Sequence, residues 1–138
     1  MKINGIVFVN YKYLILLLVS GFINSSYALT LDKTIVVNEL ERFDLSAQVQ
    51  SMNGYDIRAR RFIVPPSVSI GQHQHSTRPG IVYVESGEIT ELRGEVERTM
   101  KKGDSLIEDK NTIHSYINNS DENCILIAFD LPRTINEK

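Results

Sequence analysis

The three histidines of this chain, His73, His75 and His114, carry its most distinctive pattern. Residues two apart on a β-strand project from the same face, so His73 and His75 would present their imidazoles side by side. Two such nitrogens can chelate one metal ion, and His114 could complete a three-nitrogen site from a neighbouring strand. Taken alone, a His-x-His pair is equally compatible with a solvated turn. The surrounding sequence must decide between these two interpretations.

Short strands would be needed to position these histidines, and the apolar residues of the chain form runs that are typical of short strands. β-branched and aromatic residues form brief runs, and turn residues such as Asn53-Gly54 separate them. The expected strands are 35–37, 57–64, 81–84, 113–117 and 125–129, with the His-x-His pair on a further strand over 70–76. We expect a helical turn only over 38–43. Many short strands between close turns predict an all-β sandwich or barrel.

Length, charge and cysteine content exclude several classes of protein. With 138 residues the chain has room for one ordinary domain, which excludes a multidomain enzyme. Its 15 Lys and Arg against 17 Asp and Glu give a net charge of -2, without long runs of either sign. A nucleic-acid binder held by a basic face is therefore not expected, and a small molecule is the expected partner. The single cysteine, Cys124, excludes an intramolecular disulfide and is expected to be a buried core thiol.

Residues 1–28 differ in character from the rest of the chain. Lys2 and Lys12 precede an uncharged apolar stretch over 14–23, and small residues lead up to Ala28. This pattern is typical of a Sec-type signal peptide cleaved after Ala28. The alternative is an uncleaved membrane anchor, but a bilayer span needs about 20 apolar residues, and Lys12 interrupts any longer stretch. We expect an exported, periplasmic or extracellular protein without stable membrane anchoring, whose single domain covers 29–138.

The histidines also stand within two longer patterns that resemble the two motifs of the cupin superfamily. The first motif contains a Gly, the His-x-His pair, a Glu and a closing Gly, and the second contains a Gly, a Pro-x-Gly, a His and an Asn. The positions that match are His73, His75, Gly87, Gly103, His114 and Asn118. The resemblance covers about residues 58–130, and over this range the chain is similar to small single-domain cupins of the type-2 conserved-barrel kind. It implies a double-stranded β-helix, a jelly-roll-like barrel, with a divalent metal ion held by histidines.

Four positions depart from the two motifs. Ser67 replaces the opening Gly of the first motif, while Asp109 and Asn111 replace the Pro and Gly of the second. All three are residues that turns accept. The more serious departure is Gly80, which occupies the position of the family's metal-binding Glu. A metal ion would then be held by three imidazoles, with positions left open to water or substrate, as catalytic sites require.

Another carboxylate could replace the absent Glu, and Glu108 is the candidate. It ends a strand before the turn into His114, so it could contact the ion or orient a metal-bound water. It could equally be a surface carboxylate at the end of a strand. Strand alternation directs Glu85 away from the site. Glu88 and Glu91 allow the same two interpretations as Glu108, and we do not select them as candidates.

Further polar residues could line the cavity of such a barrel. Tyr116 shares strand parity with His114, so its hydroxyl could point into the barrel mouth, although the side chain could instead pack in the core. Glu108 and Tyr116 are therefore the candidate catalytic residues. A guanidinium group in the cavity would bind a substrate carboxylate, whereas a solvated one would have no such role. The arginines to which this applies are Arg58, Arg60, Arg61 and Arg78.

Two classes of function follow from the resemblance. The first is a small metal-dependent enzyme that acts on a small molecule, either as a dioxygenase or as an isomerase or lyase. The second is a binding module that holds a small ligand or a metal ion without turnover. A carboxylate or tyrosine within proton-transfer reach of the metal would favour the enzyme. A cavity lined only by valine and leucine would favour binding.

The resemblance also bears on the metal and on oligomeric state. Three neutral imidazoles suit zinc, copper, nickel or iron(II). Because an exported chain would take up its metal outside the cytoplasm, we expect zinc or copper in preference to iron, manganese or nickel. Cupins often pair through an exchanged N-terminal strand, which implies a possible homodimer with a contact over 34–37.

Overall fold

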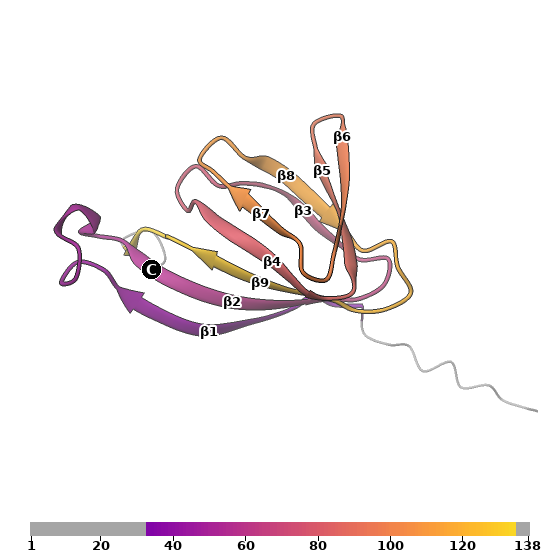
Figure 1. Ribbon diagram of the computed structural model, residues 1–138, viewed down its shortest axis with the longest axis horizontal. Coiled ribbons are helices and arrows are strands. Elements are labelled where there is room, and N and C mark those ends of the chain that lie inside the picture. Colours follow the sequence, from indigo (N-terminus) through magenta and orange to yellow (C-terminus); the bar gives the residue numbers. More distant parts are fainter. Residues whose placement is uncertain (1–32, 135–138) are drawn as a thin grey trace, which may run out of the picture. The chain divides into compact units, whose positions relative to one another are not determined.

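Nine β-strands in two sheets make up the computed structural model over residues 33–134, the part of the chain that it describes (Figure 1). The strands are β1 (Val36–Asp44), β2 (Asp56–Val64), β3 (Ser69–Gln74), β4 (Gly80–Ser86), β5 (Glu88–Arg93), β6 (Val96–Lys101), β7 (Ser105–Glu108), β8 (Ile113–Ile117) and β9 (Cys124–Asp130). A short 3-10 helix, η1 (Gln50–Met52), lies between β1 and β2. Among the described residues, no helix is long and apolar enough to cross a membrane. The predicted signal peptide over 1–28 lies outside the described residues, so its cleavage stays a prediction.

The strand order brings segments that are far apart in the sequence side by side. One sheet has five strands in the order β1-β2-β9-β4-β7, and the other has four in the order β3-β8-β5-β6. All neighbouring strands are antiparallel. Buried apolar side chains from both sheets form one core, which includes Val64, Val84, Ile89, Met100 and Leu126. The predicted all-β fold is confirmed.

The strands that the sequence predicts most accurately are those with continuous apolar runs. The expected strand 113–117 coincides with β8, and the expected strand 57–64 begins one residue inside β2. The expected strands 81–84 and 125–129 lie within β4 and β9. Cys124, at the start of β9, is fully buried as expected, and its burial raises the pKa of the thiol to about 11.

The helical turn expected over 38–43 is wrong. These residues belong to β1, which pairs with β2 along its length despite a register shift between Glu39 and Glu41. Arg42 Nε lies 3.0 Å from Glu39 Oε1, and Arg42 also donates to Asp56 on β2 at 2.8 Å. Glu39 and Arg42 are three residues apart, the spacing of an ion pair on a helix, but here they pair within a strand that contains a β-bulge. The pairing of β1 with β2 therefore outweighs the local preference of this segment for a helical turn. The dimer contact expected over 34–37 overlaps the start of this edge strand, which begins at Val36, and stays a prediction.

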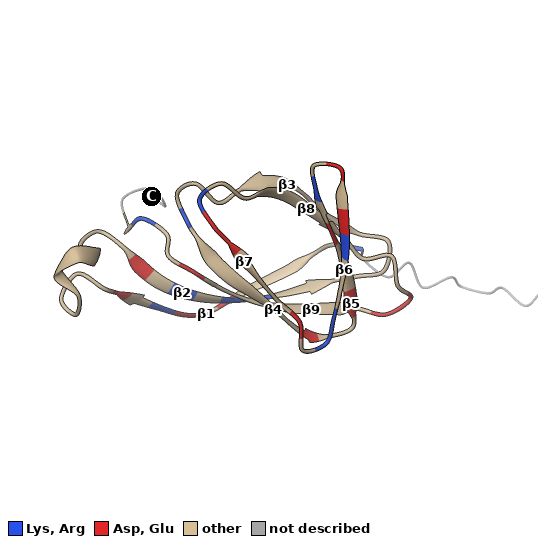
Figure 2. Ribbon diagram, turned by 45° about the horizontal axis from the view of Figure 1, so that its top comes forward, with Lys and Arg blue, Asp and Glu red and all other residues tan. Residues whose placement is uncertain are grey.

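Residues of both charges occur on strands of both sheets, although β3 and β8 contain none (Figure 2). A smaller set is buried, namely Asp56, Arg58, Glu91, Glu108 and Asp130. Charged side chains are almost never fully buried unless they are paired. Clusters of buried titratable groups therefore indicate where a functional site should be sought.

Candidate metal centre

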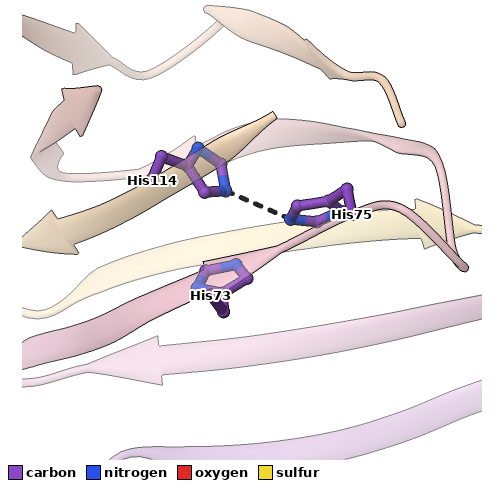
Figure 3. Close-up of side chains that lie close together, drawn as sticks. All are labelled: His73, His75 and His114. Atoms are coloured by element: carbon purple, nitrogen blue, oxygen red, sulfur yellow. Dashed lines mark hydrogen bonds between the residues drawn. The ribbon is translucent and has the colours of Figure 1, made fainter. Parts of the chain in front are cut away.

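Two neighbouring strands, β3 and β8, bring the three histidines together. His73 on β3 lies opposite His114 on β8 in the antiparallel register. His75 follows the last residue of β3, and its backbone N–H donates to the Thr112 carbonyl, 3.1 Å away. One possible ligand atom from each histidine lies within 4.8 Å of the others, and the rings lie close together in Figure 3. The predicted convergence of the three histidines is confirmed, although the strand expected over 70–76 ends before His75.

One nitrogen of each ring is already engaged by an oxygen acceptor. In each case Nδ1 lies at hydrogen-bond distance from a carbonyl or carboxylate oxygen. The pairs are His73 with the Gly71 carbonyl (2.9 Å), His75 with the Arg78 carbonyl (3.2 Å) and His114 with the Glu91 carboxylate (2.8 Å). Because such oxygens accept and do not donate, we assign the ring proton to Nδ1 of all three histidines. This assignment leaves a free lone pair on each Nε2.

The Nε2 atoms of His75 and His114 lie 3.1 Å apart, along the dashed line in Figure 3. Two unprotonated nitrogens cannot hydrogen-bond to each other, so a cation that binds both lone pairs would relieve their repulsion. Burial lowers the pKa of His75 to about 4 and also lowers the pKa of His114, so both rings are neutral at pH 7. Neutral imidazoles are the form that ligates transition metals. The donor set therefore fits a divalent transition metal, and the cluster could hold one.

Glu91 is the residue of this centre that sequence analysis misses. Its carboxylate is 4% exposed and accepts hydrogen bonds from His114 Nδ1 at 2.8 Å and from Arg93 Nε at 2.9 Å. Such a carboxylate fixes the tautomer and orientation of a metal-ligating histidine. Glu91 reaches His114 because β5 pairs with β8, which places Glu91 opposite Tyr116. That pairing leaves no local signal in the sequence.

Glu108 and Tyr116, the candidate catalytic residues, lie beside the histidines and contact each other. The Tyr116 hydroxyl donates to Glu108 Oε1 at 3.0 Å, and Glu108 Oε2 lies 3.4 Å from His75 Nδ1. Both side chains are buried, so the alternative of a surface carboxylate at position 108 is wrong. Burial raises the pKa of Glu108 to about 7, although the hydrogen bond from Tyr116 acts in the opposite direction. Burial also raises the pKa of Tyr116 far above its ordinary value.

The surroundings of Gly80 explain why no carboxylate stands at this position. Gly80 begins β4, where it pairs with Asp130 of β9 on one side and with Glu108 of β7 on the other. A Cβ atom at Gly80 would overlap the Phe129 carbonyl oxygen, so the close approach of β4 and β9 excludes a side chain. Paired residues on neighbouring strands project from the same face. Glu108 therefore carries its carboxylate on the face from which a side chain at position 80 would project.

Replacing Gly80 with alanine is expected to lower the free energy of unfolding by about 1–3 kcal/mol, as overpacking in a dense region does. The added methyl group would overlap the Phe129 carbonyl and press against Asp130. Chemical denaturation followed by circular dichroism measures the change. Gly71→Ala on β3 is the matched control, because its Cβ would meet nothing within 4 Å. An equal loss of stability in both variants would contradict a steric cause.

A cavity of about 250 Å³ adjoins the histidines. Its polar lining consists of Arg60, His73, His75, Arg78, Glu108 and Tyr116. Phe62, Ile70 and Leu126 contribute to an apolar wall. The cavity is therefore not lined only by valine and leucine, and a carboxylate and a tyrosine face it together with two of the histidines.

The four arginines singled out in the sequence have different surroundings. Arg61 is exposed and pairs with the exposed Glu85 at 3.2 Å, so Glu85 lies away from the centre as expected. Arg58 is buried and donates to Asp130 of β9 through Nε at 3.0 Å and Nη2 at 2.9 Å. The two that line the cavity are Arg60 and Arg78.

Comparison with protein families finds a match that covers the site. The sequence profile of the Cupin domain matches residues 60–130. That range contains all three histidines, Glu91, Glu108 and Tyr116. Among curated proteins, none matches the chain.

Solved structures that resemble this one share its fold. KdgF from Halomonas sp. has a TM-score of 0.57 and 18% identity, covering 72% of this chain and 79% of that one. A Cupin 2 conserved barrel domain protein from Salinispora arenicola has a TM-score of 0.55 and 20% identity, covering 72% and 76%. An uncharacterized conserved protein with a double-stranded β-helix domain from Klebsiella pneumoniae has a TM-score of 0.58 and 16% identity, covering 74% and 80%. At these identities the similarity concerns the fold alone.

Proposed function

This chain belongs to the Cupin domain family and has the double-stranded β-helix fold, and from this we propose a metal-dependent function. One divalent transition metal ion binds to His73, His75 and His114, and the protein acts on a small molecule in the adjoining cavity. The observation that carries the proposal is the convergence of three imidazoles whose Nδ1 atoms are all engaged by oxygen acceptors. A bound ion would supply Lewis-acid or redox chemistry at the wall of the cavity.

The residues that move a proton in this proposal are Glu108 and Tyr116. Glu108 lines the cavity, and its Oε1 accepts from the Tyr116 hydroxyl at 3.0 Å, which orients the carboxyl group. Oε2 can then take up a proton from a bound molecule or return one to it. This geometry supports isomerase- or lyase-like chemistry on a carbonyl compound or dioxygenase-like chemistry on an enol-type compound.

The metal and the place of action follow from the predicted signal peptide over 1–28. An exported protein would acquire its metal in the periplasm or outside the cell. We therefore propose zinc or copper, with iron, manganese and nickel as the alternatives. A protein isolated from the native cell envelope with iron or manganese as its main metal would contradict this choice.

A second candidate function is binding of a small ligand without turnover. The apolar wall formed by Phe62, Ile70 and Leu126 favours it, because such a wall stabilises a ligand without contributing a reacting group. The two functions differ in what Glu108 does, since a binding module has no need for a proton carrier.

Exchanging Glu108 for glutamine is expected to leave the metal content unchanged and to lower turnover about 10²–10⁴-fold, the usual contribution of a general acid or base. Elemental analysis by mass spectrometry gives the metal per chain. The metal-loaded protein is then screened for oxygen uptake with enol-type compounds and, by NMR, for isomerisation of carbonyl compounds. Glu85→Gln, on the exposed side of β4, is the matched control and is expected to retain full turnover.

Each outcome of this experiment is informative. A wild-type protein that stays free of metal after zinc and copper are offered would contradict the proposal. Metal binding without turnover in either screen would favour the binding module. Full turnover by the Glu108→Gln variant would contradict the role of Glu108 in proton transfer.

A further inference from the structure

Positive charge gathers on one wall of the cavity. The carboxylate of Asp130, which is 1% exposed, accepts from Arg58 at 2.9 Å and from Arg60 at 2.6 Å. Arg78 Nη1 lies 3.7 Å from the same carboxylate. Guanidinium groups are always ionised in proteins, so three positive charges surround the Asp130 carboxylate, and Arg60 and Arg78 also act electrostatically on Glu108. Glu108 lines the same cavity, but among residues 33–134 the carboxylate that pairs with Arg60 and Arg78 is Asp130.

Arg60 also has a donor that is not satisfied. Its side chain is only 16% exposed, and its buried Nε–H has no hydrogen-bond partner among the residues that the structure describes. A buried donor without an acceptor is energetically costly, so its persistence requires an explanation such as a bound molecule that supplies the acceptor. The guanidinium group lies over the ring of Phe62, 5.0 Å from its centroid, and this contact helps to orient it.

Arg78 joins this charged wall to the histidine cluster. Its backbone N–H donates to the His75 carbonyl at 3.1 Å, and its carbonyl accepts from His75 Nδ1 at 3.2 Å. Its side chain lines the cavity and is 28% exposed. A molecule held by Arg78 would therefore lie in the same cavity as the His75 imidazole.

We propose that the cavity takes a small carboxylic acid and that Arg60 and Arg78 hold its carboxylate. Guanidinium groups bind carboxylates through short, charge-assisted hydrogen bonds, and a carboxylate could supply an acceptor for the buried Nε–H of Arg60. The apolar wall that includes Phe62 suits a short carbon chain attached to that carboxylate. The inference rests on the proposed function, because it names the substrate class for the same cavity.

The test is calorimetric titration of the mature protein, with and without bound zinc, using butyrate as the probe and butyramide as its uncharged counterpart. Butyrate is expected to bind at least about tenfold more tightly than butyramide, which forms no charge-assisted hydrogen bond. Arg60→Gln and Arg78→Gln are each expected to weaken butyrate binding about tenfold or more. Arg61→Gln is the matched control, because Arg61 lies on the same strand as Arg60 but outside the cavity, and it should leave the affinity unchanged.

Circular dichroism establishes that each variant is folded, and Arg78→Gln, at the more exposed arginine, provides the test if Arg60→Gln does not fold. Equal binding of butyrate and butyramide, or unchanged butyrate affinity in the folded variants, would overturn the inference. Tighter binding of inorganic phosphate than of butyrate would also overturn it. A protein that binds butyrate but no metal would contradict the proposed function and support the carboxylate site. A protein that binds zinc but no butyrate would contradict the carboxylate site alone.

Discussion

Replacement of His114 by alanine is expected to abolish metal binding, with a loss of affinity beyond about a hundredfold. His114 is 1% exposed, and its Nε2 lies 3.1 Å from that of His75. Loss of a residue that only orients a ligand costs about 10–100-fold in metal affinity, so loss of the ligand itself should exceed that range. Elemental analysis of the purified protein and calorimetric titration with zinc measure the effect.

Two further variants make this result specific. Gln74→Ala is the matched control, because Gln74 is exposed and stands between His73 and His75 in the sequence, and it should bind metal normally. Glu91→Gln should give an intermediate loss of about 10–100-fold, because the ligand remains while the carboxylate that orients it is lost. Retention of a full metal complement by a folded His114→Ala variant would contradict the three-histidine centre.

The Asp130→Asn variant is expected to lower the free energy of unfolding by about 3–5 kcal/mol, as removal of one partner from a buried ion pair does. The substitution leaves Arg58, whose side chain is 7% exposed, and Arg60 without the carboxylate that they share. Chemical denaturation at neutral pH measures the loss. Glu85→Gln, which removes the exposed partner of Arg61, is the control and should cost about 0–1 kcal/mol. A similar small effect for both would contradict a stabilising role for the buried cluster.

The same aspartate predicts how stability depends on pH. Burial alone would raise the pKa of Asp130, but hydrogen bonds from Arg58 and the charges of Arg60 and Arg78 outweigh it and hold the pKa below its ordinary value of 3.8. The negative charge of Asp130 in turn helps to raise the pKa of Glu108. A depressed pKa in the folded state stabilises the protein above the unfolded value, and this stability is lost as the pH falls below about 4. As the pH falls, the wild type should therefore lose the part of its free energy of unfolding that comes from ionised Asp130. The Asp130→Asn variant has no such carboxylate and should not show this part of the loss.

The sequence predicts the ligands of the metal centre better than the residues that support them. The His-x-His spacing marks His73 and His75, although β3 ends before His75, and the spacing of the second motif marks His114, so these predictions need only local information. Glu91 and Asp130 act through the pairing of β5 with β8 and of β2 with β9, which joins segments far apart in the chain. No local pattern specifies such a register. The helical turn expected over 38–43 fails for the same reason, since β2 determines its conformation.

Gly80 and Glu108 belong to different motifs when the chain is aligned by its sequence, yet they are cross-strand partners on β4 and β7. Because paired residues project from the same face, a carboxylate on β7 lies near the point that a side chain at position 80 would occupy. The motif alone shows no carboxylate at position 80, whereas the position in the sheet shows the Glu108 carboxylate on the same face of the neighbouring strand. In this chain, the register of the sheet therefore identifies a carboxylate on this face that the motif alone does not.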